Sequence, residues 1–410
     1  TRKLKKCLRQ SVRRMRYLEM RIKEKNTMRR GRIREMLEVK DLVRRNQAGQ
    51  SRTVNQLPVM AYSDKIFVGF FKNIPAQTPN LKYSQFGKRI REERTYFKII
   101  GTEIYPVATN QYLLGIFPPG IKYDLSKVIQ CLHNMMYAHA RVVNLFKDGG
   151  YQGEIGVVHS LETKYPVSDS EEDKHAAFLD DALSIRFLLD ATYLGYYSKE
   201  TLDALEEICQ ANQARYEFLD SDFEEMKKAS HRNDYLGINH YQCHFVKAYT
   251  GENAIHHNGT GDKGTSVYKV KGIGEHIYKE GIPRTDWDWI IYPEGLYDLL
   301  LRIKSDYPHY NKIFITENGM GYKDQFDDGI IMDQPRVEYL KVYLQAISKA
   351  ISTGVNVKGY FLWSLMDLFS WSNGYNKRYG LFYVNFETQK RYPKASAYWY
   401  KHISTTKIVE

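Results

Sequence analysis

The sequence predicts an α/β fold built as a β/α barrel, and three observations support that prediction. The chain has 410 residues, and such barrels run from about 200 to over 400 residues. Two runs, residues 313–319 and 357–380, each begin as an apolar strand and end in polar and aromatic groups. Between them lies a helical stripe of apolar residues, spaced by three or four, that stops at Gly354: Val337, Leu340, Leu344, Ile347 and Ile351.

Five strand patterns follow residue 96, and each delivers a polar or aromatic side chain to its C-terminal end. They end near five residues: Glu103, His159, Tyr241, Glu317 and Trp363. Helical patterns separate them, such as residues 124–146, where Asp124 is expected to cap the helix. A long polar loop is expected after Tyr241, through Lys279, and loops of this length at a barrel mouth are usually functional.

Charge divides the chain into two parts. The formal net charge is +12, but residues 1–99 hold 27 Lys and Arg against 8 Asp and Glu, whereas residues 100–410 hold 33 against 40. We therefore expect a basic, atypical segment over residues 1–95 and the barrel strands over residues 96–410. A basic helical arm is typical of nucleic-acid binding. We instead favour a solvated charged face, a disordered extension or a stretch that is not native coding sequence, and expect no nucleic-acid partner.

Cysteine usage and hydropathy bear on the compartment. The cysteines are far apart, with no spacing typical of a metal site: Cys7, Cys131, Cys209 and Cys243. No apolar run follows the basic start, as a signal peptide would require, and no stretch approaches the length of about 20 apolar residues that crosses a bilayer. We expect a reduced, cytoplasmic protein with no metal, no cofactor and no membrane partner. The sequence leaves the oligomeric state open.

Several segments after residue 96 resemble a known family. The run ITENG at residues 315–319 and the strand end WSLMD at 363–367 resemble the C-terminal signature of glycoside hydrolase family 1. The following run, SWSNGYNKRYGLFYV at 370–384, is similar to the 6-phospho-β-galactosidases within that family. The resemblance includes residues 111–125 and 236–241. It implies a (β/α)8 TIM barrel whose strands 4–8 lie after residue 96, with the first three β/α units atypical, truncated or replaced.

Two carboxyl groups are the candidate catalytic residues. Cleaving a glycosidic bond needs one carboxyl group that protonates the leaving oxygen and a second that meets the positive charge developing on the sugar. The resemblance implies that Glu317 is the nucleophile and Glu103 the acid/base, about 5–5.5 Å apart as in retaining enzymes. An ionised Glu317 is expected to raise the pKa of Glu103. Thr102 stands where the family has Asn.

Four further residues near these strand ends are candidates for holding the sugar. The resemblance implies that Tyr241 donates a hydrogen bond to the nucleophile and that Asn239 lies near the sugar. Both could instead be ordinary polar groups at a strand end. Trp363 offers an apolar face on which a pyranose can stack, with core packing as the alternative. Trp371 matches the residue that in the family favours 6-phosphogalactosides over 6-phosphoglucosides.

A short loop after the last strand has the chemistry of a phosphate pocket. Ser370, Lys377 and Tyr379 combine a hydroxyl, an ammonium and a phenol, which all donate to a dianion. Such a trio alone is a weak signal. In the frame SWSNGYNKRYG, the resemblance implies that these residues bind a sugar 6-phosphate.

The leading hypothesis is a retaining glycosidase that hydrolyses 6-phospho-β-D-galactosides, such as lactose 6-phosphate, to galactose 6-phosphate in lactose catabolism. One alternative is an inactive or N-terminally disrupted relative that at most binds sugar phosphates, and another is a 6-phospho-β-glucosidase. The pair Glu103 and Glu317 favours a hydrolase. The early-strand Gln and His residues that the family uses to bind the sugar are not found in this sequence, which favours the inactive relative and predicts reduced activity.

Overall fold

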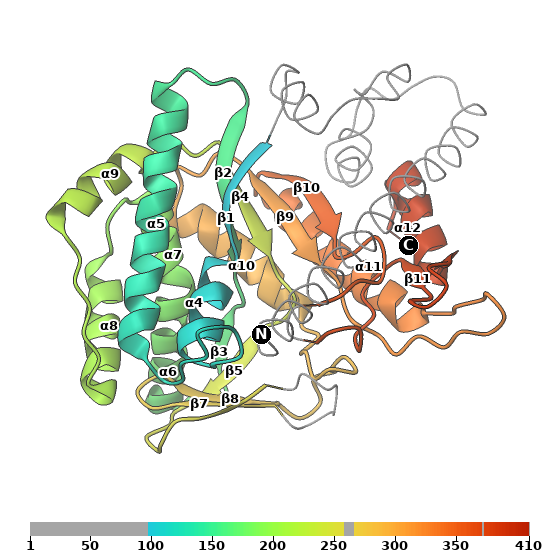
Figure 1. The fold of residues 1–410 in the computed structure, drawn as a ribbon, viewed down its shortest axis with the longest axis horizontal. Coiled ribbons are helices and arrows are strands. Elements are labelled where there is room, and N and C mark those ends of the chain that lie inside the picture. Colours follow the sequence, from blue (N-terminus) through green and yellow to red (C-terminus); the bar gives the residue numbers. More distant parts are fainter. Residues whose placement is uncertain (1–96, 258–265, 371–372, 410) are drawn as a thin grey trace, which may run out of the picture. The chain divides into compact units, whose positions relative to one another are not determined.

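The structure is a computed structural model that describes residues 97–257, 266–370 and 373–409 (Figure 1). These residues all belong to one compact unit, which spans Leu57–Glu410. The basic, atypical segment predicted at residues 1–95, and with it the predicted change in the first three β/α units, lies outside the described residues.

A parallel sheet of five strands forms the centre of the described part. Its strands lie in the order β1 (Phe97–Thr102), β2 (Glu154–Ser160), β4 (Tyr235–Asn239), β9 (Ile313–Asn318) and β10 (Val357–Leu362). Every neighbouring pair is parallel. Each strand therefore lies beside the next one along the chain, as in a β/α barrel. The five strands predicted from the sequence are confirmed, and each predicted end lies within two residues of the observed one.

Helices connect these strands. Between β1 and β2 lie α4 (Ile104–Tyr112) and α5 (Leu125–Asp148). Five helical segments lie between β2 and β4: α6 (Glu171–Asp181), the π-helix η1 (Ala182–Arg186), α7 (Phe187–Tyr193), α8 (Lys199–Asn212) and α9 (Asp220–Ser230). Three single helices complete the described set: α10 (Pro293–Asp306) before β9, α11 (Gln334–Ser352) before β10, and α12 (Ala395–Thr406).

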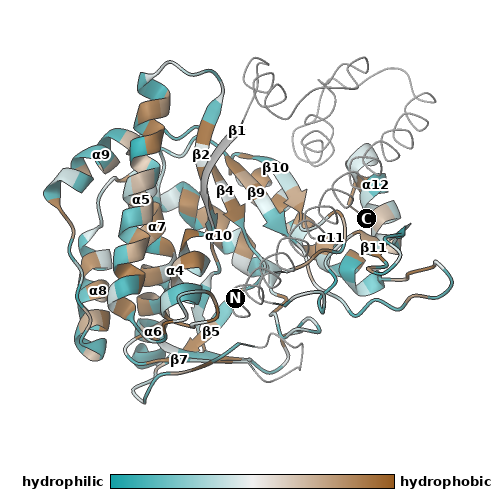
Figure 2. Ribbon diagram, in the orientation of Figure 1, coloured by the Kyte–Doolittle hydropathy of each residue, from teal (hydrophilic) through white to brown (hydrophobic). Residues whose placement is uncertain are grey.

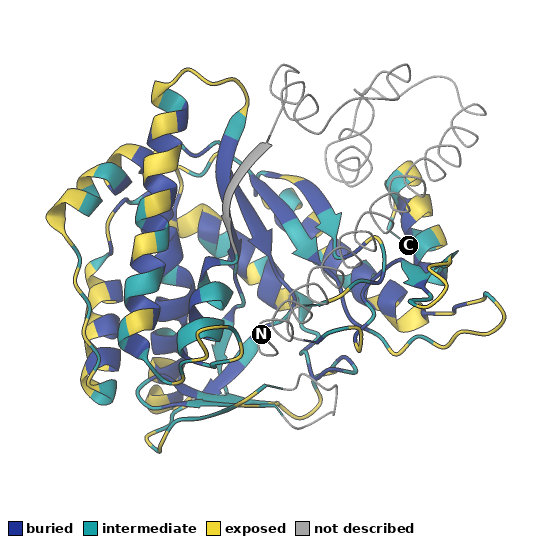
Figure 3. Ribbon diagram, in the orientation of Figure 1, coloured by how far each residue is buried: buried dark blue, intermediate teal, exposed yellow. Residues whose placement is uncertain are grey.

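Local sequence explains where these helices begin and which side they bury. The Asp124 carboxylate accepts a hydrogen bond from the backbone N–H of Lys127 and caps α5, as predicted. Ser170 and Ser198 cap α6 and α8 in the same way. The apolar stripes predicted for α5 and α11 are buried, except that Ile351 of α11 is only half-buried. Figure 3 shows buried residues along one side of α8 and exposed residues along the other.

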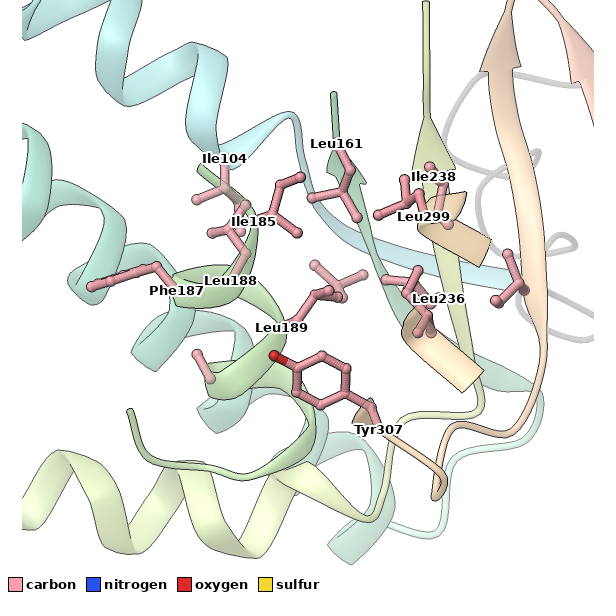
Figure 4. Packing of buried hydrophobic residues seen from close by; sticks show 14 of the residues in the cluster. Ile104, Leu161, Ile185, Phe187, Leu188, Leu189, Leu236, Ile238, Leu299 and Tyr307 are labelled. Carbon is pink, nitrogen blue, oxygen red and sulfur yellow. The ribbon is translucent and has the colours of Figure 1, made fainter. Parts of the chain in front are cut away.

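The core lies between the central sheet and the helices. Hydrophobic residues dominate β2, β4 and β9 (Figure 2), which is typical of parallel strands covered on both faces. Figure 4 shows Leu236 and Ile238 of β4 close to Leu299 of α10. All three are fully buried. At about 25 cal/mol per Å² of apolar surface removed from water, each such side chain contributes roughly 2 kcal/mol, so this core fixes the strand ends that carry the candidate site.

A second sheet is built from one strand that precedes β4 and four strands that follow it. Its strands are β3 (Lys164–Pro166), β5 (His244–Lys247), β8 (Gly274–Ile277), β7 (Val267–Val270) and β6 (Ala254–His256), in that order. The long loop predicted here was wrong. The region forms four strands, β5 to β8, which pair mainly as antiparallel neighbours. Such pairing satisfies the backbone of polar sequence without an apolar run.

Two smaller features complete the fold. An antiparallel pair, β11 (Phe382–Val384) and β12 (Arg391–Pro393), follows β10. In the described part of the chain, no helix combines the length and the apolar character needed to span a membrane.

Candidate active site

Glu103 stands at the junction between β1 and α4. It is the residue before α4 and has φ 55° and ψ 43°, in the left-handed region that non-glycine residues seldom adopt. Its backbone N–H donates to the carbonyl of Val158 on β2, at 3.3 Å. Outliers of this kind cluster at functional sites, where the surrounding structure holds them. The observed strain thus agrees with a functional role for Glu103.

Asn239 joins the two candidate carboxyl groups. It ends β4, is fully buried, and pairs in register with Glu317 of β9. Its Nδ2 donates to Oε1 of Glu103 at 3.2 Å, while its Oδ1 accepts from the Thr316 hydroxyl at 2.7 Å. Because Thr316 fixes the oxygen end of the amide, the nitrogen end faces Glu103. Three strands, β1, β4 and β9, therefore bring their C-terminal ends to one place.

Tyr241 contacts Glu317 directly. Its hydroxyl donates to Oε2 of Glu317 at 2.5 Å. Burial and the charge of Glu317 raise the pKa of Tyr241 well above its ordinary value, so the phenol stays protonated and remains a donor. The Tyr241 carbonyl accepts from the Tyr339 hydroxyl of α11 at 2.9 Å, which fixes the backbone of Tyr241. The structure therefore brings together the predicted residues Glu103, Glu317, Asn239 and Tyr241.

Burial is the main electrostatic influence on both carboxyl groups. It raises the pKa of Glu103, opposed by the Asn239 hydrogen bond and assisted by the charge of Glu162. Burial also raises the pKa of Glu317 to about 7, opposed by the Tyr241 hydrogen bond and assisted by the charge of Glu103. The sequence predicts that an ionised Glu317 raises the pKa of Glu103, and in the structure the repulsion between the two carboxyl groups acts to raise the pKa of Glu317. Among the described residues no cation pairs with Glu317, so no positive charge offsets the burial of its carboxyl group.

Trp363 lies at the end of β10, next to the Glu317 strand. Its backbone N–H donates to the carbonyl of Asn318 at 2.9 Å, and its side chain is half-buried. A Cβ at Gly319 would lie 2.1 Å from the Trp363 carbonyl oxygen, so only glycine permits this approach. The glycine of the ITENG run is thus required by the close contact between the residues that follow β9 and β10.

The three candidate phosphate residues follow β10. Ser370 and Gly374 exchange two backbone hydrogen bonds, each of 2.8 Å, and Asn373 donates to the Ser370 hydroxyl at 3.0 Å. Lys377 and Tyr379 are buried, with exposed fractions of 2% and 4%. Burial lowers the pKa of Lys377 to about 8, opposed by the charge of Asp288. Lys377 can therefore change its charge within the range in which enzymes work.

Trp371, the predicted galacto-selective residue, lies outside the described residues, as does Ser372. The structure therefore gives no position for it relative to the carboxyl groups. Its role stays a prediction.

Trp289 connects the two halves of the site, and sequence reasoning missed it. Its ring centroid lies 5.1 Å from that of Tyr241 and 5.9 Å from that of Tyr379. The Lys377 ammonium lies 6.0 Å from the Trp289 ring and 5.6 Å from the Trp287 ring. A cation at these distances is attracted by an aromatic face. The signal that could have found this residue is the pair of tryptophans in the run TDWDW, ahead of α10.

A pocket of about 310 Å³ lies beside these residues. Lys377, Trp287 and Trp289 line one part of it, and Glu162 and His244 line another. Nε2 of His244 lies 2.6 Å from Oε2 of Glu162. Glu103 and Glu317 are not among its lining residues, so this pocket adjoins the carboxyl pair rather than containing it. In the described ranges, no group of His, Cys, Asp and Glu side chains is arranged to hold a metal ion.

Relatives of known name match most of this chain. Residues 73–409 match the family described as Glycosyl hydrolase family 1. A 6-phospho-beta-galactosidase of Clostridium acetobutylicum is 56% identical over 325 residues, which are 79% of this chain and 68% of that protein. One of Leptotrichia buccalis is 58% identical over 308 residues, which are 75% of this chain and 66% of that protein. The family match begins at residue 73, whereas the resemblance seen in the sequence alone begins at about residue 96.

Solved structures agree with this assignment. A beta-glucosidase from Exiguobacterium marinum has a TM-score of 0.65 and 29% identity, over 75% of this chain and 64% of that one. A family 1 β-glucosidase from Thermotoga maritima has a TM-score of 0.65 and 30% identity, over 80% and 66%. The chain spans about two thirds of the length of these relatives. Its fold class is the (β/α)8 TIM barrel, and the chain belongs to glycosyl hydrolase family 1.

Proposed function

We propose that the protein hydrolyses 6-phospho-β-D-galactosides with retention of configuration, releasing galactose 6-phosphate and an alcohol or sugar. One observation carries the proposal. Trp289 contacts both Tyr241, which donates to Glu317, and Tyr379, beside the buried cation Lys377. A carboxyl pair and a phosphate-binding group thus share one aromatic wall. The names of the two most similar relatives reported above support the same substrate class.

The proposed reaction has two steps. Glu103 protonates the glycosidic oxygen while Glu317 attacks the anomeric carbon, which forms a glycosyl-enzyme and releases the leaving group. Glu103 then takes a proton from water, which attacks the same carbon and frees Glu317. Burial raises the pKa of Glu103 and so favours the protonated form that the first step needs. Esterification of Glu317 removes its charge, and this lowers the pKa of Glu103 for the second step.

The phosphate is held by charge and by donors. A sugar 6-phosphate brings close to two negative charges at pH 7, and a buried ammonium is the strongest match available on this loop. Lys377 supplies that ammonium, while the Ser370 and Tyr379 hydroxyls donate hydrogen bonds. A bound dianion favours the charged form of Lys377, whose pKa burial has lowered to about 8. Trp371 is proposed to favour the galacto over the gluco configuration.

The finer biological setting is also a proposal. Lactose 6-phosphate is the natural disaccharide that fits this site chemistry, so we place the protein in lactose catabolism in the cytoplasm. Cys131, Cys209 and Cys243 are free thiols, which agrees with a reducing compartment.

A second candidate is a protein that binds sugar phosphates with little turnover. One observation favours it. The pKa of Glu317 is about 7 and no cation among the described residues pairs with it, so a large fraction of the nucleophile is protonated at neutral pH. Such a protein would retain Lys377 and Tyr379 and bind galactose 6-phosphate, but would cleave its glycosides slowly.

One experiment separates the candidates. Purified protein is assayed with three chromogenic substrates: a 6-phospho-β-galactoside, a 6-phospho-β-glucoside and an unphosphorylated β-galactoside. The proposed hydrolase cleaves the first with the highest kcat/KM, and Glu317→Gln abolishes that activity. A wild type that binds galactose 6-phosphate but shows no turnover above the Glu317→Gln background identifies the binding protein instead. Equal kcat/KM for the phosphorylated and unphosphorylated galactosides refutes the phosphate site.

A further inference from the structure

The segment from Ser370 to Tyr379 is called the phosphate loop below. Near its end, successive side chains point to opposite sides. Lys377 and Tyr379 are buried, while the residue between them, Arg378, has a side chain that is 20% exposed. Successive residues of an extended segment point to opposite sides. Arg378 therefore reaches away from the candidate phosphate side, into the structure behind the loop.

Asp367 holds the Arg378 side chain. Nη1 of Arg378 donates to Oδ2 of Asp367 at 2.7 Å and to the carbonyl of Val384 at 2.9 Å. The guanidinium lies 4.0 Å from the centre of the Tyr383 ring and 4.7 Å from that of Phe386. A planar guanidinium that is both paired with a carboxylate and stacked on aromatic rings has little conformational freedom left. The middle of the loop is thus fixed through this one side chain.

The same carboxylate also fixes the end of the loop. Oδ1 of Asp367 accepts from the backbone N–H of Gly380 at 3.0 Å and from Nζ of Lys394 at 2.8 Å. A Cβ at Gly380 would lie 2.2 Å from the backbone nitrogen of Asp367, so the two segments are as close as glycine allows. Asp367 therefore holds the residue on each side of Tyr379, Arg378 through its side chain and Gly380 through its backbone N–H.

The backbone carbonyl of Arg378 is held from a third direction. It accepts from the N–H of Tyr322 at 3.1 Å and from Nη2 of Arg336 at 2.9 Å. Arg336 is fully buried and pairs with Asp324 at 3.1 Å and with Asp333. These contacts tie the phosphate loop to the segment that follows Glu317 and to the start of α11.

The charges of this network balance. Its cations are Arg336, Arg378 and Lys394, and its anions are Asp324, Asp333 and Asp367. Breaking a buried pair by removing one partner is strongly destabilising, because an uncompensated charge remains. Each charge of the network therefore has a partner, and removing any one of them would leave an uncompensated charge.

We propose that Arg378 and Asp367 are positioning residues for phosphate specificity, which rests on the proposed function above. They contact no phosphate themselves. They fix the backbone on which Lys377 and Tyr379 stand, so that the ammonium and the phenol are aimed at one point before the ligand arrives. Without them, the long Lys377 side chain and its backbone would have to be ordered at the moment of binding, which weakens the complex.

The test is the selectivity of binding. The measurement is the ratio of the Kd for galactose to the Kd for galactose 6-phosphate, by calorimetry, in wild type and in Arg378→Gln. Ordering one long side chain at the moment of binding costs up to about 10-fold in affinity, so we expect the ratio to fall by between about 2-fold and 10-fold. In the chromogenic assay the loss should appear in KM for the phosphorylated substrate rather than in kcat.

A matched control comes from elsewhere in the fold. Arg302 of α10 makes two hydrogen bonds to Asp181, of 2.5 and 2.8 Å, and its side chain is 21% exposed, much like that of Arg378. Arg302→Gln should lower Tm to a similar degree and leave the binding ratio at the wild-type value. Arg378→Lys keeps the charge beside Asp367 but not the stacking, so it should give an intermediate ratio, and it decides the matter if Arg378→Gln does not fold.

The possible outcomes distinguish the proposed function from the positioning role of Arg378. A wild type that binds galactose and galactose 6-phosphate equally well overturns the proposed function and the positioning role together. A wild type that prefers galactose 6-phosphate, with the preference retained in both Arg378 variants, overturns the positioning role alone. Arg378 would then stabilise the fold in the same way as Arg302.

Discussion

Tyr241→Phe is the substitution that tests the chemistry of the carboxyl pair most directly. It removes only the hydroxyl that donates to Glu317 at 2.5 Å and leaves the ring packed against Trp289. The Tyr241 hydrogen bond opposes the effect of burial on Glu317. Its loss should therefore raise the pKa of Glu317 further.

The expected size follows from the strength of a hydrogen bond to a charged group. Such bonds contribute about 1.5–3 kcal/mol, and one pKa unit corresponds to about 1.4 kcal/mol, so the shift is about 1–2 units. The pKa of Glu317 starts at about 7. At pH 7 the ionised fraction of Glu317 would fall from about a half to between about a tenth and a hundredth, and kcat/KM would fall in proportion.

The assay is the pH dependence of kcat/KM for a chromogenic 6-phospho-β-galactoside, which reports ionisations of the free enzyme. The nucleophile must be ionised, so activity rises with pH through the pKa of Glu317. In wild type this acid limb should lie near pH 7, and in Tyr241→Phe it should move upward by about 1–2 units. Trp289→Phe, which changes the neighbouring ring but not the hydroxyl, should leave the position of the limb unchanged.

If Tyr241→Phe lowers kcat/KM by the same factor at every pH, the predicted effect of Tyr241 on the pKa of Glu317 is wrong. The hydroxyl would then assist the transition state without controlling the ionisation of Glu317. An acid limb well below pH 6 in wild type would show that a cation acts on Glu317 from outside the described residues.

Three further predictions concern the phosphate loop and the core. Lys377→Met should raise KM for the phosphorylated galactoside far more than for the unphosphorylated one, and an equal rise for both would contradict the phosphate site. Because the pKa of Lys377 is about 8, affinity for galactose 6-phosphate should be full below pH 8 and fall above it in wild type. Calorimetry should show no such fall in Lys377→Met. In the core, the buried Asp190 carboxylate accepts hydrogen bonds from the hydroxyls of Ser198, Thr201 and Tyr307. Asp190→Ala should lower the free energy of unfolding, measured in urea, by about 3 kcal/mol. A decrease of less than about 1 kcal/mol would contradict this prediction.

Local pattern was enough to predict the central elements of the described fold. The five parallel strands are apolar runs with polar ends, and α5 and α11 have apolar residues spaced by three or four, so each pattern has one structural solution. The four strands β5 to β8 were missed. Each is only three or four residues long and only partly buried, which is too short for a clear alternating pattern.

The sequence by itself was enough to nominate the residues that we propose to carry the chemistry. Motifs of the family nominated Glu103 and Glu317 as the carboxyl pair and the trio from Ser370 to Tyr379 as the phosphate loop, because residue type and local spacing are written in the chain. The described structure brings Glu103, Asn239, Tyr241 and Glu317 together.

Only the tertiary structure decided how these groups behave. The pKa values of Glu317 and Lys377 depend on burial. Trp289 contacts Tyr241, more than 40 residues earlier in the chain, and Tyr379, more than 80 residues later. The contacts that hold Arg378 come from Tyr322 after β9, Arg336 of α11 and Asp367 after β10. Desolvation and pairing of this kind are sums over neighbours in space, and a linear sequence does not contain them.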